Sequence, residues 1–208
     1  MLHQYFVTAI GTDSGKTFVS AILTEALQAT YWKPIQSGLP RDTEKVQSLV
    51  SKNLSFLPEK YLLTQPLSPH AAAAIDGVQI AINAVEIPTN TGNLIVEGAG
   101  GVLVPLNQQH FVIDLAAKLQ LPVIVVANLY LGSINHTLLT IKELQRREEQ
   151  GLIKIKGLVF NGNINSASEE IILHHSPYPC LFRVNQEDAI NFDTVKQYAE
   201  VVRKVLNQ

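Results

Sequence analysis

Short apolar runs rich in Val and Ile recur along the chain and alternate with longer segments that have helical spacing. The runs lack the polar alternation of a half-exposed strand, which is typical of strands buried on both faces of a parallel sheet. These runs span residues 5–10, 93–101, 121–128 and 155–163. Segments with an apolar helical stripe span residues 16–29, 133–150 and 192–208. The alternation predicts an α/β fold in which a mostly parallel sheet carries helices on both faces.

The stretch from residue 50 to residue 92 is less regular. It contains Pro58, Pro66, Pro69 and Pro88, so we expect loops and short helices over one edge of the sheet. The chain shows no internal repeat, low-complexity tract or clear linker, and 208 residues suffice for one domain with a sizeable core. We therefore expect residues 1–208 to form a single domain.

Composition and charge narrow the class of protein. The chain has 16 Lys and Arg residues against 18 acidic ones, and a net charge of −2 gives no electrostatic footprint for nucleic acid. The longest apolar runs are much shorter than the roughly 18 residues of a membrane span, and the N-terminus has no signal-peptide pattern. Cys180 is the only cysteine, so no internal disulfide can form. We expect a cytoplasmic protein that binds neither nucleic acid nor membrane.

The sequence TDSGKT, at residues 12–17, connects the first apolar run to the first helical segment and has the composition of a phosphate-binding loop. In such a loop the backbone N–H groups at a helix start point at phosphate oxygens, and the helix dipole favours the anion. Gly15 lets the backbone approach the phosphates, Lys16 brings a positive charge, and the Thr17 hydroxyl can ligate Mg²⁺.

The spacing of this loop is irregular. A P-loop usually has four residues between its two glycines, but Ile10 stands where that spacing requires glycine, and Ala9 is the small residue at the start of the loop. Gly-Lys-Thr also arises by chance, and strand-to-helix turns are often rich in small residues. The position between a buried strand and an amphipathic helix favours phosphate binding over that alternative.

Further polar residues stand at the ends of predicted elements. Lys33 follows a short apolar stretch and precedes a proline, so it ends a short strand at the edge that carries the loop, or else it is a surface lysine in a turn. Asp42 can cap a helix, bind a metal, or do both. Glu97 ends an apolar strand, where a carboxylate can hold Mg²⁺, although a glycine-rich turn with an incidental acid is the alternative. Ser133 and Asn135 are candidate caps of the helix that begins there, whose N–H groups could receive a carboxylate.

Taken together, these stretches resemble the dethiobiotin synthetase family, and the resemblance covers almost the whole chain. The motifs come in the family's order: FVTAIGTDSGKT, KPIQSG, DTEKV, LSPHAAA, VEGAGGVLVPL, LPVIVVAN, LGSINHTLLT and GLVFNGN. VEGAGG combined with KPIQSG and LGSINHT is specific, whereas the P-loop alone is not. The family's phosphate loop carries one extra residue before Gly-Lys-Thr, which explains the irregular spacing, and Ala9 replaces the glycine usual there.

The resemblance implies a P-loop ligase of biotin synthesis that depends on ATP and Mg²⁺. Its substrates would be 7,8-diaminononanoate, CO₂ and ATP. One amine takes up CO₂ as a carbamate, and the carbamate attacks the γ-phosphate to give a carbamic–phosphoric anhydride. The second amine then closes the ureido ring, so the products are dethiobiotin, ADP and phosphate. The family also implies a homodimer whose active sites are shared between subunits.

The resemblance further implies roles for individual residues. The catalytic groups are matched by Lys33, Lys16 and Thr12, and the metal ligands by Thr17, Asp42 and Glu97. The substrate contacts are matched by Ser37 and, across the dimer interface, by Ser133, Ile134 and Asn135. The nucleotide contacts are matched by Asp13, Ser14, Gly15, Lys16, Thr17, Phe18, Asp42, Glu97, Gly98, Ala99, Gly100, Asn161, Gly162, Asn185, Gln186 and Glu187. The last three match loosely, because the family's base-contacting loop often contains proline and FRVNQED has none, so base selectivity stays open.

Two other classes of P-loop protein compete with this interpretation. ATPase switches that position cargo or division machinery carry a signature lysine at the position that Gly11 holds here. ATP-dependent amidoligases usually need a glutaminase domain with its own cysteine nucleophile, whereas Cys180 is expected to be structural. Both comparisons favour the ligase, and the switch ATPase is the stronger alternative.

Overall fold

The computed structural model describes residues 2–206 of the chain. The strands are β1 (Gln4–Ala9), β2 (Thr30–Trp32), β3 (Ile35–Ser37), β4 (Phe56–Leu57), β5 (Tyr61–Leu63), β6 (Leu94–Gly101), β7 (Val123–Asn128), β8 (Ile155–Asn161) and β9 (Cys180–Val184). The helices are α1 (Lys16–Leu27), α2 (Asp42–Leu49), α3 (Pro69–Ile75), α4 (Val112–Leu119), α5 (Ser133–Glu149), α6 (Ser166–His174) and α7 (Phe192–Leu206), with one 3₁₀ turn at Ile82–Ala84.

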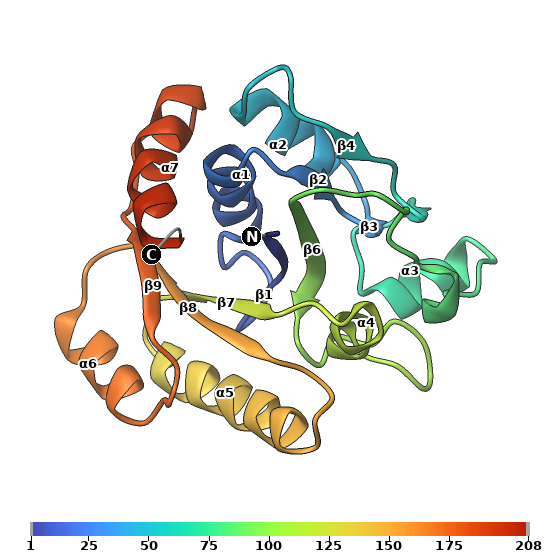
Figure 1. Cartoon of the computed structure of the whole chain (residues 1–208). Coiled ribbons are helices and arrows are strands. Elements are labelled where there is room, and N and C mark those ends of the chain that lie inside the picture. Colours follow the sequence, from blue (N-terminus) through green and yellow to red (C-terminus); the bar gives the residue numbers. More distant parts are fainter. Residues whose placement is uncertain (1, 207–208) are drawn as a thin grey trace.

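The main sheet has seven strands in the order β4-β2-β6-β1-β7-β8-β9, and the pairings between them are parallel. Strand β1 lies at its centre, between β6 and β7 (Figure 1). A second, two-stranded parallel sheet joins β3 to β5 beside the main sheet. The α/β fold with a mostly parallel sheet, predicted from the uninterrupted apolar runs, is confirmed.

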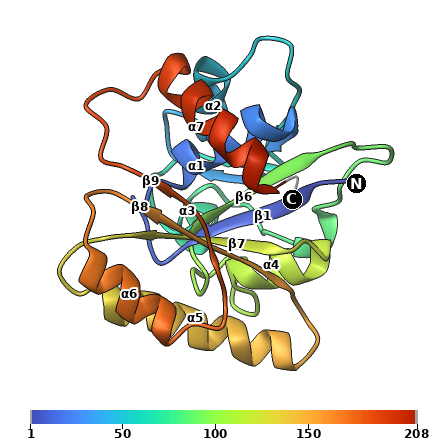
Figure 2. The ribbon, with the colours of Figure 1, turned by 60° about the vertical axis from the view of Figure 1, so that its left-hand side comes forward.

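Helices cover both faces of the sheet, with α1, α2 and α7 on one face and α4, α5 and α6 on the other (Figures 1 and 2). Successive strand residues point to opposite faces, so Val7 packs with the α1 side and Phe6 with the α4 side. Both faces are therefore apolar, which is why these strands read as continuous hydrophobic runs. Phe6 and Phe160 are fully buried, and each such side chain stabilises the fold by about 1.5–3 kcal/mol.

The irregular stretch differs from its prediction in detail. It contains α3 and the 3₁₀ turn as expected, but also β4 at the sheet edge and β5 in the small sheet. Strand β4 has two residues and β5 has three, too few for a periodic pattern to show. Within residues 2–206, no helix is long and apolar enough to cross a membrane.

The parallel arrangement brings the ends of three neighbouring strands to one edge. Strand β2 pairs with β6, and β6 pairs with β1, with Trp32 beside Val96 and Val7 beside Glu97. The loop that follows β1, the residue that follows β2 and Glu97 of β6 therefore meet there. Strand β6 continues past Glu97 to Gly101, so the prediction that Glu97 ends its strand is wrong: the glycine-rich stretch that suggested a turn stays part of the strand. Ligands bind at this edge in open α/β sheets.

Candidate active site

The loop between β1 and α1 owes its shape to Gly15 and not to its first residue. Gly15 precedes α1 with φ 89°, in the left-handed region that favours glycine. A Cβ atom there would lie 2.1 Å from Nδ2 of Asn161, so any larger residue would strain the backbone and displace the Asn161 side chain. Ala9 is the last residue of β1, pairs with Val126, and is not among the described residues with positive φ. Alanine in place of glycine at this position is therefore free of backbone strain.

Lys16 opens α1 and is buried, with 7% of its surface exposed. Its Nζ donates a hydrogen bond to the carbonyl oxygen of Gly11 at 3.1 Å. The pKa of Lys16 is lowered to about 8, first by burial and then by the positive charge of Lys33, against the opposing effect of the nearby carboxylates. Among the residues that the structure describes, this ammonium therefore has no strong anionic partner, as expected of a group that receives phosphate.

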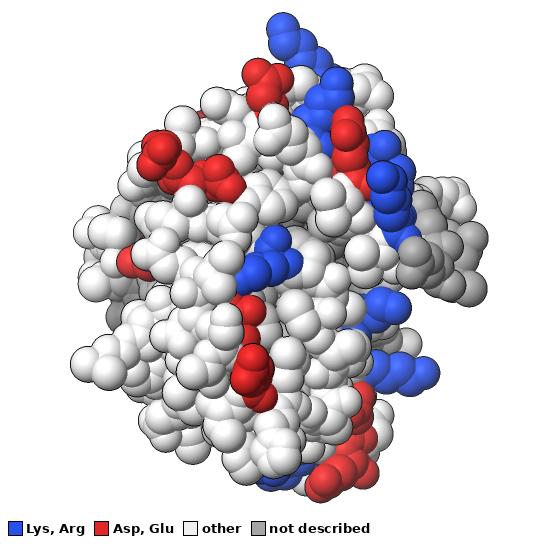
Figure 3. Space-filling view, turned by 90° about the vertical axis from the view of Figure 1, so that its left-hand side faces the viewer, with Lys and Arg blue, Asp and Glu red and all other residues white. Residues whose placement is uncertain are grey.

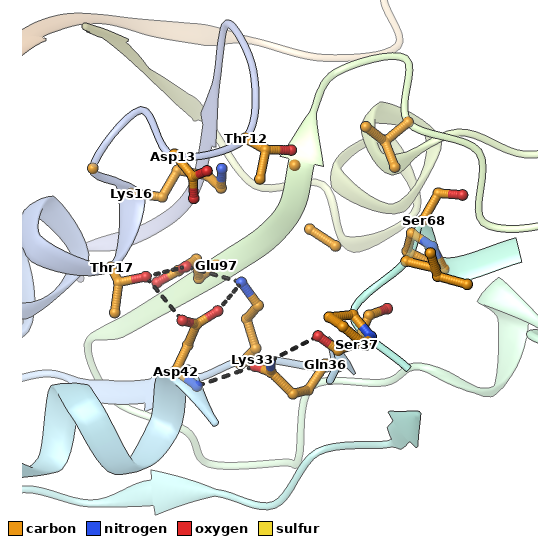
Figure 4. Close-up of a pocket in the computed structure, with 17 residues that line it drawn as sticks. Thr12, Asp13, Lys16, Thr17, Lys33, Gln36, Ser37, Asp42, Ser68 and Glu97 are labelled. Carbon is orange, nitrogen blue, oxygen red and sulfur yellow. Dashed lines mark hydrogen bonds and ion pairs between the residues drawn. The ribbon is translucent and has the colours of Figure 1, made fainter. Parts of the chain in front are cut away.

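Lys33 lies between two carboxylates at the edge of the sheet (Figure 4). Its Nζ is 2.7 Å from Oδ2 of Asp42 and 2.9 Å from Oε1 of Glu97, and it also donates to the carbonyl oxygen of Gly98 at 3.2 Å. Lys33 is 4% exposed and Glu97 is 1% exposed. Burial opposes the charge of Lys33, but Glu97 and Asp42 more than offset it, so the pKa of Lys33 is raised. The side chain is a buried, charged group and not a surface lysine.

The Thr17 hydroxyl reaches the same two carboxylates. Its Oγ1 lies 3.1 Å from Oδ1 of Asp42 and 3.1 Å from Oε1 of Glu97, and its single proton serves one of them at a time (Figure 4). The other oxygen of Glu97, Oε2, accepts a hydrogen bond from the hydroxyl of Tyr31 at 3.0 Å. The buried carboxylate of Glu97 is therefore fully partnered, which removes the cost of an unpaired buried charge.

The oxygen atoms of Thr17, Asp42 and Glu97 fit a magnesium ion. Mg²⁺ prefers oxygen ligands and is usually bound through one or two carboxylates together with phosphates and water. In this structure the ammonium of Lys33 forms ion pairs with Asp42 and Glu97, so both carboxylates are already placed to contact a positive charge, as a metal ion would require. Among the described residues, no group of three or more His, Cys, Asp and Glu side chains could hold a metal, so an ion here would depend on the hydroxyl and on further oxygen ligands.

Asp42 does not cap α2, contrary to one of the two roles considered from the sequence. It is the first helical residue, Arg41 occupies the cap position, and no cap side-chain hydrogen bond is formed. The N–H of Asp42 instead donates to Oε1 of Gln36 at 3.1 Å, while Nε2 of Gln36 donates to the carbonyl oxygen of Gly38 at 3.1 Å. Gln36 thus fixes the start of α2 from outside the helix. Sequence reasoning missed it, although its place between apolar Ile35 and the predicted Ser37 was a signal.

These residues line a cavity of about 710 Å³. It brings together eleven of the residues predicted from the sequence: Thr12, Asp13, Gly15, Lys16, Thr17, Lys33, Ser37, Asp42, Glu97, Ala99 and Gly100. The hydroxyl oxygen of Ser37 is buried and has no hydrogen-bond partner within residues 2–206, as expected of a group that contacts a ligand. Sequence reasoning missed the remaining lining residues, which are Gln36, Pro66, Leu67, Ser68, Pro69 and Val104. Ser68 and Pro69 belong to the quoted LSPHAAA motif, whose presence was the available signal.

The residues predicted to contact the base lie outside this cavity, around the start of α1. Nδ2 of Asn161, at the end of β8, donates to the carbonyl oxygen of Ser14 at 3.0 Å. The N–H of Asn185 donates to the hydroxyl of Tyr198 at 3.0 Å, and that hydroxyl also bonds to Glu187. The ring of Tyr198 meets the ring of Phe18 edge-on at 6.0 Å. Tyr198 therefore ties the loop after β9, which includes Gln186, to α1.

Arg183 is a further residue of this region that sequence reasoning missed. Its NH1 donates to the carbonyl oxygen of Gly162 at 3.0 Å and to Oδ1 of Asn185 at 2.7 Å. Its other nitrogens pair with Glu169 of α6, at 2.8 and 2.9 Å. Arg183 thus joins the two loops that follow β8 and β9. Its position in the FRVNQED stretch, where an apolar strand ends, was the only signal in the sequence.

The start of α5 is not part of the cavity in a single chain. Ser133, Ile134 and Asn135 are absent from its lining. The cap position of α5 is held by Gly132 with φ 101°, so the prediction that Ser133 or Asn135 caps the helix is wrong. Glycine supplies the left-handed backbone, and the Ser133 hydroxyl is buried without a partner. Next to it, Leu131 is fully exposed.

The charged surface shows no large area of one sign on the face that Figure 3 displays. Acidic and basic side chains are interspersed there among a majority of uncharged residues (Figure 3).

Comparison with known proteins identifies the family. Residues 3–194 match the AAA domain family. The chain is 53% identical over 201 residues to ATP-dependent dethiobiotin synthetase BioD of Cytophaga hutchinsonii, covering 95% of this chain and 96% of that protein. It is 45% identical to the protein of the same name from Christiangramia forsetii, covering 99% of each chain.

Among solved structures, the fold resembles that of apo McdA from Cyanothece, with a TM-score of 0.59 over 99% of this chain and 100% of that chain, at 12% identity. A ParA family ATPase from Chlorobium tepidum has a TM-score of 0.52, covering 100% of this chain and 92% of that chain, at 14% identity. At such identities the match describes the fold alone. The sequence relatives share identity along nearly their whole length, and the chain belongs to the ATP-dependent dethiobiotin synthetase family.

Proposed function

We propose that this protein uses ATP to join CO₂ to 7,8-diaminononanoate and to close the ureido ring of dethiobiotin. The observation that carries the proposal is the group of Lys16, Lys33, Thr17, Asp42 and Glu97 at the end of the phosphate loop, in a chain of this family. One amine of the substrate adds to CO₂ and loses a proton, giving a carbamate. A carbamate oxygen attacks the γ-phosphorus and ADP leaves. The second amine attacks the carbamoyl carbon, the ring closes, and phosphate leaves with a proton passing to solvent.

Most of the catalytic work in this scheme is positioning and charge neutralisation. A carbamate and a triphosphate are both anions, so they repel each other unless cations lie between them. Lys16 would neutralise the outer phosphates from the helix start, and Lys33 would neutralise the reacting oxygens. Thr12 and Ser37 line the same cavity and would hold the carbamate and the amine by hydrogen bonds.

Mg²⁺ would be held by Thr17, Asp42 and Glu97, together with phosphate oxygens, and would supply positive charge that stabilises the transferring phosphoryl group. ATP would lie along the start of α1, with Asp13 to Phe18 and Glu97 to Gly100 near the phosphates. The base would lie near Asn161 and Gly162, beside the loop of residues 185–187.

The proposed reaction is tested by measuring phosphate release from ATP with Mg²⁺ and bicarbonate, with and without 7,8-diaminononanoate. We expect release that depends strictly on the diamine, and a cyclic urea product by mass spectrometry. Slow release that is indifferent to the diamine would overturn the ligase and favour a P-loop ATPase switch instead.

We further propose that residues 1–208 form a single domain and that two copies form a homodimer with shared sites. Support comes from the start of α5, where Ser133 to Asn135 lie outside the cavity of their own chain and next to the exposed Leu131. The backbone N–H groups at this helix start would receive the substrate carboxylate in the partner's cavity. The unpaired Cys180 supports a cytoplasmic, reducing location.

The shared site is tested by mixing two inactive variants, Lys33→Ala and Gly132→Val. A mixed dimer would combine the intact Lys33 of one chain with the intact α5 start of the other, so mixing should restore activity. Light scattering of the active mixture should show a dimer. The two variants are unfolded, mixed and refolded, and wild-type protein is treated in parallel as the control. A mixture that stays inactive while the wild-type protein recovers would contradict the shared site.

A further inference from the structure

Tyr31 is a fully buried tyrosine whose hydroxyl meets the candidate metal site. It lies on β2, and its side chain is 0% exposed. Its backbone pairs with Ile95 of β6 and with Phe56 of β4, and its ring packs 6.1 Å from that of Phe56. Most of the ring is therefore ordinary core. The hydroxyl is different, because it donates to Oε2 of Glu97 at 3.0 Å.

The strand register explains why this hydroxyl reaches Glu97. Alternate residues of a strand share a face, and Tyr31 is paired with Ile95, two residues before Glu97. The long side chain of Tyr31 therefore extends along the strand direction toward the carboxylate. A shorter or apolar residue at this position would leave Oε2 of Glu97 without its donor, since the carboxylate is 1% exposed.

The two oxygens of Glu97 are thereby divided between two tasks. Oε2 accepts the hydrogen bond from the Tyr31 hydroxyl, whereas Oε1 faces Thr17 and Lys33, at 3.1 and 2.9 Å. A tyrosine hydroxyl is protonated at neutral pH and has one proton to donate, and here that proton is directed at Oε2. It is then a permanent donor that holds the carboxylate in one rotation.

We propose that Tyr31 is a positioning residue for the metal: its hydroxyl fixes the Glu97 carboxylate so that Oε1 is presented to the divalent cation. This inference rests on the proposed metal role of Glu97. Groups that orient a metal ligand through its other oxygen or nitrogen typically contribute a factor of about 10–100 to metal affinity. Loss of the Tyr31 hydroxyl should therefore weaken metal binding without touching the nucleotide itself.

The test is the variant Tyr31→Phe, which keeps the ring and removes only the donor. Binding of Mn²⁺, measured by electron paramagnetic resonance in the presence of a non-hydrolysable ATP analogue, should weaken by about tenfold or more. The affinity for the analogue without metal should change less than about twofold. Tyr5→Phe is the matched control, because Tyr5 is 7% exposed and its hydroxyl contacts His3 at 3.2 Å, outside the site.

A double-mutant comparison with Glu97→Gln separates the inference from the proposed function on which it rests. Glu97→Gln should itself weaken Mn²⁺ binding, and adding Tyr31→Phe should then have little further effect, because the two residues act through one contact. If Glu97→Gln weakens Mn²⁺ binding and folded Tyr31→Phe does not, the positioning role is overturned and the metal role of Glu97 stands. If Glu97→Gln leaves Mn²⁺ binding unchanged, both are overturned.

Folding is followed separately, because Glu97 is buried and loses a partner in Tyr31→Phe. Thermal unfolding with EDTA reports whether the variant retains its fold. If Tyr31→Phe does not fold, the same measurement is made with 4-aminophenylalanine at position 31, which keeps the length of the tyrosine and an N–H donor in place of the hydroxyl. Mn²⁺ affinity near that of the wild type is then expected, and a tenfold loss in this folded variant would overturn the inference. Equal losses of Mn²⁺ affinity in Tyr31→Phe and Tyr5→Phe would indicate a general packing effect and would also overturn the inference.

Discussion

Replacement of Lys33 by methionine should move metal affinity and turnover in opposite directions. Methionine preserves most of the length and apolar surface of the lysine stem and removes the charge. In the protein, that charge lies 2.7 Å from Asp42 and 2.9 Å from Glu97, in contact with the two carboxylates that we assign to the metal. The ammonium therefore competes with a divalent cation for the same oxygens.

The magnitude follows from these distances. At an effective dielectric constant of about 20, two unit charges 2.7–2.9 Å apart interact with about 6 kcal/mol. The Asp42 side chain is 31% exposed, so water screens part of this interaction. If about a quarter of the energy remains, removal of the ammonium strengthens Mn²⁺ binding about tenfold. Without metal, Lys33→Met leaves the buried Glu97 charge uncompensated, and the free energy of unfolding should fall by about 3 kcal/mol.

Turnover should fall at the same time, because the variant lacks the ammonium that we propose neutralises the reacting oxygens. Loss of one such charge-stabilising group typically costs about 100- to 1,000-fold in kcat. Phosphate release, Mn²⁺ binding and urea unfolding with EDTA measure the three effects, and Lys196→Met on the exposed face of α7 is the control. Turnover within twofold of the wild type would refute the role of Lys33, and weaker Mn²⁺ binding would refute the competition.

Three further predictions concern the loop, acid stability and the dimer. Gly15→Ala should abolish ATP binding, measured by calorimetry, because its Cβ would lie 2.1 Å from Asn161. The control Gly151→Ala has open space around it and should bind ATP normally, despite a stability cost of about 1 kcal/mol. Hydrogen bonds from Arg146, and to a lesser degree Arg147, lower the pKa of Glu143 to about 2 from its ordinary 4.5, so this carboxylate stabilises the fold above pH 4.5 and loses that effect as pH falls toward 2. In urea titrations, Glu143→Gln should therefore lower the free energy of unfolding by about 1 kcal/mol at pH 7, after a discount for solvent screening, and should not change it near pH 2. A loss of stability that is constant with pH would contradict this origin. Leu131→Arg should shift light scattering from dimer to monomer, and a persistent dimer would place the interface elsewhere.

The sequence predicted the central strands well and the sheet edge poorly. Strands β1, β6, β7 and β8 are buried on both faces, so each is a continuous apolar run that stands out by composition. Strand β4 at the edge has two residues of intermediate exposure, and its pairing with β2 depends on contacts across the chain. The local pattern of apolar and polar residues does not show which distant strand a short segment will pair with.

For the candidate site, the sequence predicted which residues gather but not how they are paired. The carboxyl ends of parallel strands meet at one edge, so the grouping of Lys33, Thr17 and Glu97 could be expected from the order of elements. The hydrogen bonds from Tyr31 to Glu97 and from Asp42 to Gln36 could not, because both depend on strand register and side-chain reach. Arg183 escaped notice for the same reason, since its partners come from three separate segments.

The two lysines of the cavity are in opposite electrostatic states, and this difference suggests an order of events. Within residues 2–206, the ammonium of Lys16 hydrogen-bonds only to the carbonyl oxygen of Gly11, and its pKa is lowered to about 8, so an incoming phosphate would be its first full counter-charge. Lys33 is already neutralised by Asp42 and Glu97, which raise its pKa, so it adds no net positive charge for a second anion. Its ammonium becomes free for the carbamate only when these carboxylates have another positive partner. Productive use of Lys33 should therefore follow the arrival of the nucleotide with its metal, and the carbamate should be neutralised only beside a loaded triphosphate.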